Sequence, residues 1–419
     1  MSNAHDVLVV GAGIGGLTLA LQLHRAGVPC RVLEAAPALT PLGVGINILP
    51  HAARELHRLE LGHELDRVAV RPSEGVFYNR FGQLIYTEPL GSAAGYGWAQ
   101  YSVHRGDLQM LLLAAVRERC GADALLLGAR AVEVEQDDRE VTVIVEDTTS
   151  NGGGARSRVK AGVVIGCDGV HSAVRRALYP EEGALRYTGY TMWRGVTVAP
   201  PFLTGATMVR AGWLATGKMV IYPIRNRVDS AGNQLINWVA ELETPQRGER
   251  DWNHEGALAD MAGPFADWRF DWLDVPALIR DAERILEYPM VDQEPLPRWS
   301  FGRVSLLGDA AHPMVPRGAN GAGQAILDTR ALADRLVALS DPVAALAAYD
   351  EQRREATAAV VRLNRTNPPD AILREVYERT GDQPFERIED VMSDADFEAI
   401  LGTYRAVAGY SREALRPTR

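Results

Sequence analysis

Cysteine is scarce in this sequence of 419 residues, which contains only Cys30, Cys120 and Cys167. The three are scattered, so they form neither the close pairs typical of zinc and iron–sulfur sites nor a disulfide framework. We therefore expect no bound metal. Cysteines without disulfide partners fit a reducing, cytoplasmic location.

Basic charge is also in deficit, because 44 Lys and Arg residues face 54 Asp and Glu residues and the formal net charge is −10. A surface of this sign repels nucleic acid and anionic membranes, so neither is expected as a partner. The apolar run at residues 7–23 follows Asp6 without any Lys or Arg, unlike a signal peptide. Its glycines and its length also fit poorly with a membrane span, which needs ~20 predominantly apolar residues.

The same run predicts a strand, a glycine turn and a helix. Residues 7–10 are apolar, residues 11–16 read G-x-G-x-x-G, residues 17–26 have helical spacing, and a second strand ends at Glu34. In this pattern Gly11 allows the tight turn, Gly13 lets the backbone approach a pyrophosphate, and Gly16 lets the helix pack on the strand. The helix N-terminus favours the pyrophosphate, and Glu34 is placed to accept hydrogen bonds from a ribose diol. The segment predicts dinucleotide binding.

Two further strands end in Gly-Asp turns. Residues 163–169 end in Gly166-Cys167-Asp168-Gly169, before a short basic helix. Residues 304–313 contain Gly308-Asp309, and a glycine-rich stretch at 317–323 precedes a helix expected from about Gln324 to Leu339. A single Gly-Asp after a strand is more often a turn or helix cap. Together with the N-terminal turn, two such loops indicate an extended cofactor lying across the carboxyl ends of several strands.

The loop at residues 317–323 leaves backbone amides open at a helix N-terminus. Such an end stabilises negative charge, as on the pyrimidine edge of a reduced flavin. Because like charges repel, we assign Asp309 to a sugar-alcohol hydroxyl or to water rather than to a phosphate.

The middle of the chain, residues 186–294, reads as short strands, clearest at 191–197, 218–222 and 235–242. This region holds six of the eight tryptophans: Trp193, Trp213, Trp238, Trp252, Trp268 and Trp272. Tryptophan faces suit an aromatic ligand, although a tryptophan in a sheet is more often a core residue. We name Trp193, Arg194 and Tyr222 as pocket candidates. Arg194 either pairs with a substrate carboxylate or lies on the surface.

No side chain is an evident catalyst. His51, His104, His171 and His312 invite a general-base interpretation, but a structural role is expected for each of them. The sequence shows no Ser/His/Asp constellation and no metal-ligand spacing. This pattern fits an enzyme whose cofactor performs the chemistry.

The three glycine motifs together resemble those of the single-component FAD-dependent aromatic hydroxylases, the p-hydroxybenzoate and salicylate hydroxylase group. Residues 41–48, 100–106, 191–197 and 288–292 are similar in particular to the phenazine-carboxylate monooxygenases of that group. The loop Pro313-Met314-Val315-Pro316-Arg317 departs from the phenazine pattern. The identity of the substrate is therefore left open, whereas FAD binding is expected.

The resemblance implies roles for individual residues. Glu34 would hold the adenosine ribose, Arg105 the ribityl or phosphate region and Asp309 the ribityl chain. Pro316 would lie near the substrate or the flavin. The FAD-binding residues implied in this way are Gly11, Gly13, Ile14, Gly15, Gly16, Glu34, Gly45, Arg105, Asp168, Gly308, Asp309, Gly318 and Gly321.

The resemblance also implies the architecture: an α/β protein with a Rossmann-type FAD-binding domain, an interleaved mixed β-sheet substrate domain and a C-terminal helical region. We assign residues 1–75, 101–185 and 295–365 to the FAD-binding domain and residues 76–100 and 186–294 to the substrate domain. Residues 366–419 form the helical region.

The expected activity is hydroxylation of an electron-rich aromatic or N-heteroaromatic substrate by dioxygen through a flavin hydroperoxide, with or without decarboxylation. One dinucleotide motif implies that FAD is resident and that NADH or NADPH binds transiently. The alternatives are an oxygen-independent flavin reductase or dehydrogenase and a non-catalytic flavin-binding redox sensor. The nicotinamide preference and the oligomeric state are not specified by the sequence.

Overall fold

The computed structural model describes residues 6–41, 43–149, 154–245 and 255–416. One half of the molecule is built around a six-stranded sheet, whose strands come from distant parts of the chain. Strand β1 (Val7–Val10) lies between β12 (Val163–Gly166) and β2 (Cys30–Leu33) and is parallel to both. The sheet continues through β8 (Leu125–Leu126) on one side and β21 (Val304–Leu306) and β20 (Ser300–Phe301) on the other. All four residues of β1 are buried, as expected for a strand covered on both faces.

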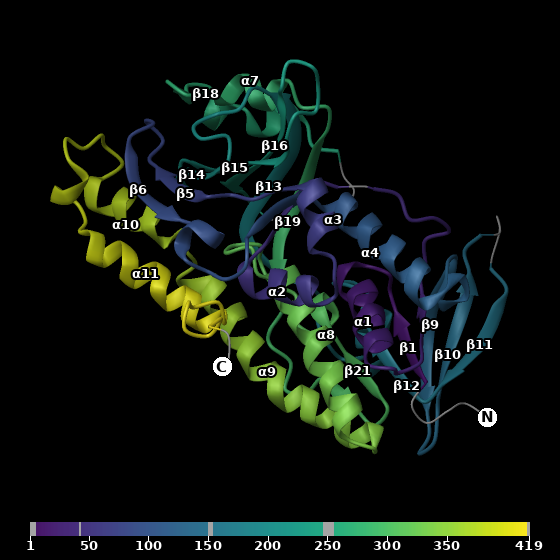
Figure 1. Cartoon of the computed structure of the whole chain (residues 1–419). Coiled ribbons are helices and arrows are strands. Elements are labelled where there is room, and N and C mark those ends of the chain that lie inside the picture. Colours follow the sequence, from purple (N-terminus) through teal and green to yellow (C-terminus); the bar gives the residue numbers. More distant parts are fainter. Residues whose placement is uncertain (1–5, 42, 150–153, 246–254, 417–419) are drawn as a thin grey trace.

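Helices cover this sheet (Figure 1). Helix α1 (Ile14–Arg25) contacts α4 (Arg105–Cys120) and α8 (Gly321–Ala338), and α8 also packs on α9 (Pro342–Thr366). The shorter helices of this half are α2 (Pro50–Arg58), α3 (Gly62–Val68) and α5 (Ala173–Leu178). Their apolar faces and the sheet share one hydrophobic core.

Two small sheets flank the main one. Strands β9 (Ala129–Gln136), β10 (Val141–Asp147) and β11 (Arg156–Ala161) form an antiparallel sheet. Strand β7 (Tyr101–His104) pairs with both β3 (Gly45–Ile48) and β4 (Ala69–Val70). The second of these sheets pairs Gly45 with His104 and so brings the loop that ends at Gly45 beside the start of α4.

The second half is a seven-stranded mixed sheet in the order β19-β13-β16-β15-β14-β5-β6. Its strands are β5 (Glu74–Tyr78), β6 (Leu84–Pro89), β13 (Arg186–Ala199), β14 (Thr207–Trp213), β15 (Gly217–Arg225), β16 (Gln234–Glu243) and β19 (Ile285–Asp292). One face carries Trp238 and Met219 in a core with α7 (Val275–Arg280). Because strand side chains alternate, the other face presents a different set of residues.

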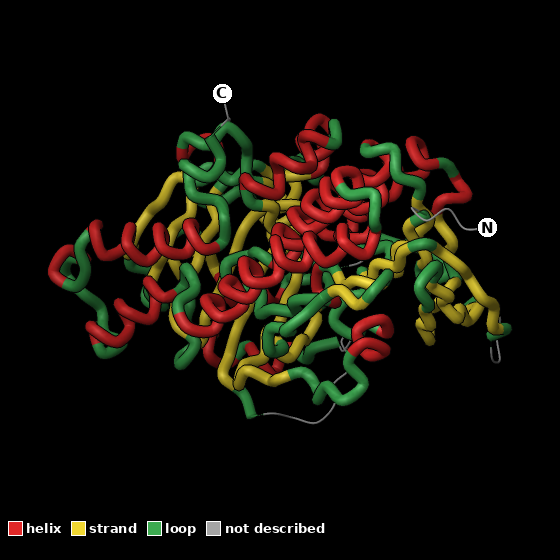
Figure 2. The backbone as a smooth tube through the Cα atoms, turned by 90° about the horizontal axis from the view of Figure 1, so that it is seen from below, coloured by secondary structure: helices red, strands yellow, loops and turns green. Residues whose placement is uncertain are grey.

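The C-terminal helices α10 (Ala371–Thr380) and α11 (Asp394–Val407) lie alongside β5 and β6 (Figure 1). They share a core in which Ile372 and Phe397 pack near Phe77 and Ile85. In the view of Figure 2, helices cover the strands over much of one side of the molecule.

The α/β fold class is confirmed, with a mostly parallel first sheet, a mixed second sheet and C-terminal helices. The strands expected at 191–197, 218–222 and 235–242 lie within β13, β15 and β16. Among the described residues, no helix has the length and apolar character needed to cross a membrane.

Candidate cofactor and active site

The turn after β1 has the geometry that a dinucleotide site requires. A Cβ at Gly16 would lie 1.9 Å from the Gly11 carbonyl oxygen, so only glycine allows α1 to approach β1 this closely. Gly11 has φ +104°, and a Cβ there would meet the Cys167 carbonyl oxygen at 2.5 Å. A Cβ at Gly13 would meet nothing within 4 Å. The open space at Gly13 adjoins the N-terminus of α1, where Ile14 and Gly15 lie in the first turn.

Glu34, at the end of β2, is fixed in place by backbone amides. Its Oε2 accepts from the Ala12 amide and its Oε1 from the Ala36 amide, both at 2.8 Å. Each carboxylate oxygen keeps a further acceptor site. The side chain is therefore oriented beside the glycine turn and can still accept from a ribose hydroxyl.

Arg105 opens α4 next to the loop at residues 43–45. The position of a Cβ on Gly43 would lie 3.8 Å from the Arg105 side chain, and the Arg105 amide donates to the Val44 carbonyl at 2.9 Å. Arg105 is exposed, which leaves its guanidinium available to a phosphate or sugar. His104 is held to the Gly43 carbonyl at 3.0 Å, so it supports the same loop.

Asp168 is engaged with the start of α5. Its carboxylate accepts from the Ser172 hydroxyl at 2.5 Å and from the Ala173 amide at 2.7 Å. Burial raises the pKa of this carboxyl, although these hydrogen bonds oppose the shift. The motif thus fixes a helix that carries Arg175, whose guanidinium donates to the Ala310 carbonyl at 2.9 Å. In this way the second glycine turn supports the third.

The third turn and its loop lead into α8. Gly308 and Gly318 have φ +64° and +80°. Asp309 is exposed, and no hydrogen bond to its carboxylate occurs among the described residues. A Cβ at Gly321, the first residue of α8, would lie 3.8 Å from the Asp309 carboxylate. A free acceptor and a helix N-terminus therefore lie side by side.

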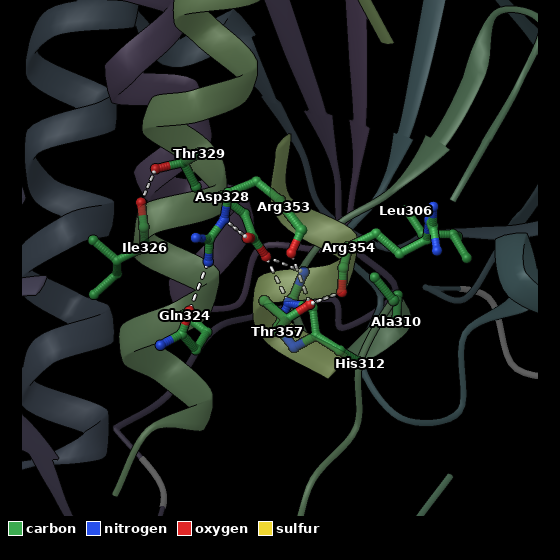
Figure 3. Close-up of polar contacts among 12 residues, drawn as sticks. Leu306, Ala310, His312, Gln324, Ile326, Asp328, Thr329, Arg353, Arg354 and Thr357 are labelled. Atoms are coloured by element: carbon green, nitrogen blue, oxygen red, sulfur yellow. Dashed lines mark hydrogen bonds and ion pairs between the residues drawn. The ribbon is translucent and has the colours of Figure 1, made fainter. Parts of the chain in front are cut away.

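A buried polar network lies against the first turns of α8, which this loop precedes (Figure 3). His312 Nε2 lies 2.6 Å from Asp328 Oδ2, and Arg353 donates to Asp328 Oδ1 at 2.8 Å. Arg353 also donates to Gln324 Oε1 at 2.7 Å. His312 is therefore a structural residue, as expected.

Sequence reasoning missed the C-terminal contacts of this loop. The Tyr404 hydroxyl accepts from Asn320 at 3.0 Å and donates to Asn364 at 2.7 Å. A Cβ at Gly318 would lie 2.0 Å from the same hydroxyl, and Gln324 donates to the Ala408 carbonyl at 3.0 Å. No local pattern around Tyr404 indicates these contacts, which join residues 40 or more positions apart.

Arg194 and Tyr222 lie together on the sheet face opposite to the Trp238 core. Arg194 donates to the Gly45 carbonyl at 2.5 Å, and Asn237 accepts from the Gly45 amide at 2.7 Å. Tyr222 interacts with Arg194 and Asn47; burial raises its pKa, although the Arg194 charge opposes the shift. This sheet face is therefore tied directly to the Gly45 loop.

Trp193 is not on this face. It is 2% exposed and belongs to the core on the other side of the sheet, with Trp238 and Trp268. Adjacent strand residues point to opposite faces, so Trp193 and Arg194 cannot line one pocket. Trp272 adjoins that core, Trp213 lies at the end of β14, and Trp252 lies outside the described residues. Pro316 is exposed in the loop before α8, where its carbonyl accepts from the Ala319 amide at 3.1 Å.

Two of the remaining histidines, His51 and His171, have lowered pKa values. His51 is buried against Tyr410, and burial together with the Arg353 charge lowers its pKa to about 3, so it is neutral at physiological pH. Burial and the Arg176 charge lower the pKa of His171. No group of three or more potential metal ligands occurs in the described part of the chain.

These features fit FAD: open space at Gly13, a carboxylate with free acceptor sites at Glu34, a free carboxylate at Asp309 and a helix N-terminus at Gly321. The model of the family described as "FAD binding domain" matches residues 4–364. The phenazine 1,6-dicarboxylic acid hydroxylase PhzS of Lysobacter antibioticus is 42% identical over 410 residues, which cover 97% of this chain and 98% of the relative.

Two further similarities agree with this match. The 3-amino-4-hydroxybenzoate 2-monooxygenase PtmB3 of Streptomyces platensis is 35% identical over 372 residues, covering 87% of this chain and 88% of the relative. The crystal structure of Klebsiella pneumoniae HpxO with FAD and uric acid matches with a TM-score of 0.77 at 23% identity, covering 99% of this chain and 97% of that one. The chain therefore belongs to the FAD-binding-domain family of flavin-dependent aromatic hydroxylases and is an FAD-dependent monooxygenase.

Proposed function

We propose that this enzyme hydroxylates a carboxylated, electron-rich aromatic or N-heteroaromatic ring, with NADH or NADPH as electron donor and dioxygen as co-substrate. The names of both relatives describe aromatic carboxylic acids as substrates. The observation that carries the proposal is the link between the two halves: Arg194, on the second sheet, donates to the Gly45 carbonyl in the loop beside Arg105. A ring bound on this sheet face would therefore lie next to the cofactor loop.

Residues of the chain then have distinct tasks. When bound, FAD supplies the activation of dioxygen. Gly13 and the α1 N-terminus would bind the pyrophosphate, Glu34 and Asp309 the hydroxyl groups, and the α8 N-terminus the negative charge of the reduced ring. Apolar side chains of the sheet face, such as Met192 and Val239, would exclude water from the reacting ring.

Three finer assignments belong to the same proposal. The FAD-binding residues named from the sequence are those that hold the cofactor. The chain divides into an FAD-binding domain (1–75, 101–185 and 295–365), a substrate domain (76–100 and 186–294) and a helical region (366–419). The enzyme works in the cytoplasm, and loss of carbon dioxide accompanies hydroxylation when the attacked carbon bears the carboxylate.

The test is an oxygen-labelling experiment on the purified flavoprotein. NADH or NADPH is added with a panel of phenazine carboxylates and hydroxybenzoates under labelled dioxygen, and products are analysed by mass spectrometry. We expect one labelled oxygen atom per product molecule. Oxygen derived from water would contradict the proposal, and substrate-stimulated NAD(P)H oxidation without an oxygenated product would favour the reductase alternative.

A further inference from the structure

A cavity of about 320 Å³ lies where the start of β13, the loop before α8 and the C-terminal end of α9 meet. Tyr187, Tyr190 and Trp213 provide aromatic walls, Val315 adds an apolar surface, and Arg317 also lines the space. Pockets of this size and composition hold small aromatic ligands.

Arg317 is buried, and its ion pair with Glu241 is long. Its side chain is 9% exposed, and its Nε lies 3.6 Å from Glu241 Oε2, beyond hydrogen-bond distance. Neither Nε nor Nη2 has a hydrogen-bond partner in the described part of the chain. The guanidinium lies over the Tyr190 ring, 4.8 Å from its centroid. A buried guanidinium with open donors is costly unless an anion occupies them.

The acids near Arg317 are shared with other cations, although Glu241 Oε2 takes part in no hydrogen bond in the described part of the chain. Lys218 donates to Glu241 Oε1 at 2.7 Å and also pairs with Asp370. Arg210 Nε lies 3.3 Å from Asp370 Oδ1. Three buried cations thus share two carboxylates, and one positive charge is left over. Burial raises the pKa of Asp370, but the Lys218 and Arg210 charges outweigh it and keep the pKa low.

The other arginines at this cavity are neutralised by acids of their own. Arg186 and Arg365 both pair with Asp292 and Glu294. Arg374 donates to the Thr366 carbonyl at 3.1 Å and to Glu375 at 3.2 Å. The excess charge of the cavity is therefore located on Arg317.

We propose that this cavity receives the carboxylate of the aromatic substrate, with the carboxylate on the Arg317 guanidinium and the ring against Tyr187, Tyr190 and Trp213. This rests on the proposed function in one respect, that the ligand is the compound to be hydroxylated. Arg317 directly precedes Gly318, so the bound carboxylate lies at one end of the loop that leads to α8. Arg317 is thus a specificity-determining residue, a role that the sequence had suggested for Arg194.

The test compares a charged ligand and a neutral ligand of the same shape. Phenazine-1-carboxylate and phenazine are titrated into the FAD-loaded enzyme by calorimetry, with wild type, Arg317→Gln and Arg374→Gln. Loss of a charge-assisted pair predicts roughly 10- to 100-fold weaker binding of the carboxylate to Arg317→Gln and a change below about twofold for phenazine. The matched control Arg374→Gln should weaken carboxylate binding by less than about threefold, because this guanidinium is already paired.

Several results would overturn the assignment. Unchanged carboxylate affinity in Arg317→Gln would do so, and so would an equal loss for both ligands, which is the signature of a collapsed cavity. If Arg317→Gln does not fold, Arg317→Lys replaces it in the test. This variant keeps the positive charge but loses the planar guanidinium that forms two hydrogen bonds with a carboxylate, so it should bind the carboxylate several-fold less tightly than wild type. In addition, carboxylate binding to wild type should quench tryptophan fluorescence, and Trp213→Phe should remove most of this quenching; quenching that Trp213→Phe does not alter would contradict the location.

The two proposals can fail separately. If no compound is hydroxylated but carboxylate binding depends on Arg317, the cavity stands and the proposed function is wrong. If hydroxylation proceeds and the KM of Arg317→Gln equals that of wild type, the function stands and the cavity assignment is wrong.

Discussion

Glycine is needed at different positions of the first turn for different reasons. At one position the fold requires it, and at another we expect cofactor binding to require it. A Cβ at Gly16 would lie 1.9 Å from a backbone oxygen, whereas one at Gly13 would meet no protein atom within 4 Å. Gly13 also has φ −73°, which any residue adopts. The fold therefore requires glycine at position 16, whereas at position 13 only space for a ligand would require it.

A pair of substitutions tests this distinction. Gly13→Val should change the unfolding free energy of the apoprotein by less than about 1 kcal/mol. The same variant should weaken FAD binding by roughly tenfold or more, or about 1.4 kcal/mol, because the side chain fills the pyrophosphate path. Flavin absorbance per protein and chemical unfolding of the apoprotein measure the two effects.

The matched variant is Gly16→Val, which should be strongly destabilised before FAD is added, since the new side chain overlaps the Gly11 carbonyl. Full FAD affinity in Gly13→Val would show that the pyrophosphate does not pass this residue.

Residue roles that depend on local geometry could be predicted from the sequence, and those that depend on burial could not. The G-x-G-x-x-G spacing is a local pattern, and the structure places each glycine accordingly. The isolation of Arg317 depends on the pairing of Glu241 with Lys218, which is a long-range contact. By contrast, the opposite orientation of Trp193 and Arg194 follows from alternation along the strand expected at 191–197, and only the face that each takes needed the structure.

At the scale of elements, strong patterns fixed the positions of strands and helices to within a few residues. The helix expected at 324–339 is α8, Gly321–Ala338, and it begins earlier because the glycines themselves enter the first turn. The strand expected at 191–197 extends to Arg186–Ala199, because pairing with β16 and β19 continues beyond the apolar stretch. Sequence pattern marks the buried middle of an element, whereas hydrogen bonding sets its ends.

Helix α8 also depends on a buried carboxylate that the sequence did not single out. Asp328 is fully buried; it lies 2.6 Å from His312, accepts from Arg353 at 2.8 Å and accepts from the Gly308 amide at 3.3 Å. Burial raises the pKa of Asp328, but the charges of His312 and Arg353 outweigh this and lower it. A carboxyl whose folded pKa is lowered contributes stability above its unfolded pKa, and this contribution is lost as pH falls through the folded value.

Asp328→Asn should therefore lower the unfolding free energy by about 3 kcal/mol at pH 7, because it leaves Arg353 buried without its carboxylate. The difference from wild type should persist from pH 7 down to about 4, near the unfolded pKa of Asp, and shrink only below it. Urea unfolding at pH 7, 5 and 3.5 measures this difference.

The control on the same helix is Asp334→Asn, which removes an exposed pair with Arg330 and should cost less than about 0.5 kcal/mol. If the Asp328→Asn difference disappeared between pH 7 and 5, the carboxyl would not have the lowered pKa assigned to it.

At the scale of the whole molecule, the C-terminal helices connect parts that are distant in sequence. Arg405, on α11, pairs with Glu88 at 2.5 Å, and Tyr410 accepts from Tyr96 at 2.8 Å through its carbonyl. Tyr404 reaches the loop before α8 through Asn320. The last part of the chain therefore joins the second sheet to the loop beside the cofactor site. The expectation of a helical region at residues 366–419 did not include this position.

Removal of one hydroxyl tests whether that connection matters for the cofactor. Tyr404→Phe leaves the buried amide groups of Asn320 and Asn364 without their shared partner, which should cost about 1–2 kcal/mol of stability. Because Asn320 directly precedes α8, FAD should also dissociate several-fold faster, as followed by the rise of flavin fluorescence on release. Tyr377→Phe, on α10, is the control, since no hydrogen bond to that hydroxyl is found among the described residues. Equal release rates in Tyr404→Phe and wild type would mean that the C-terminal helices pack on the enzyme without influencing how firmly the flavin is held.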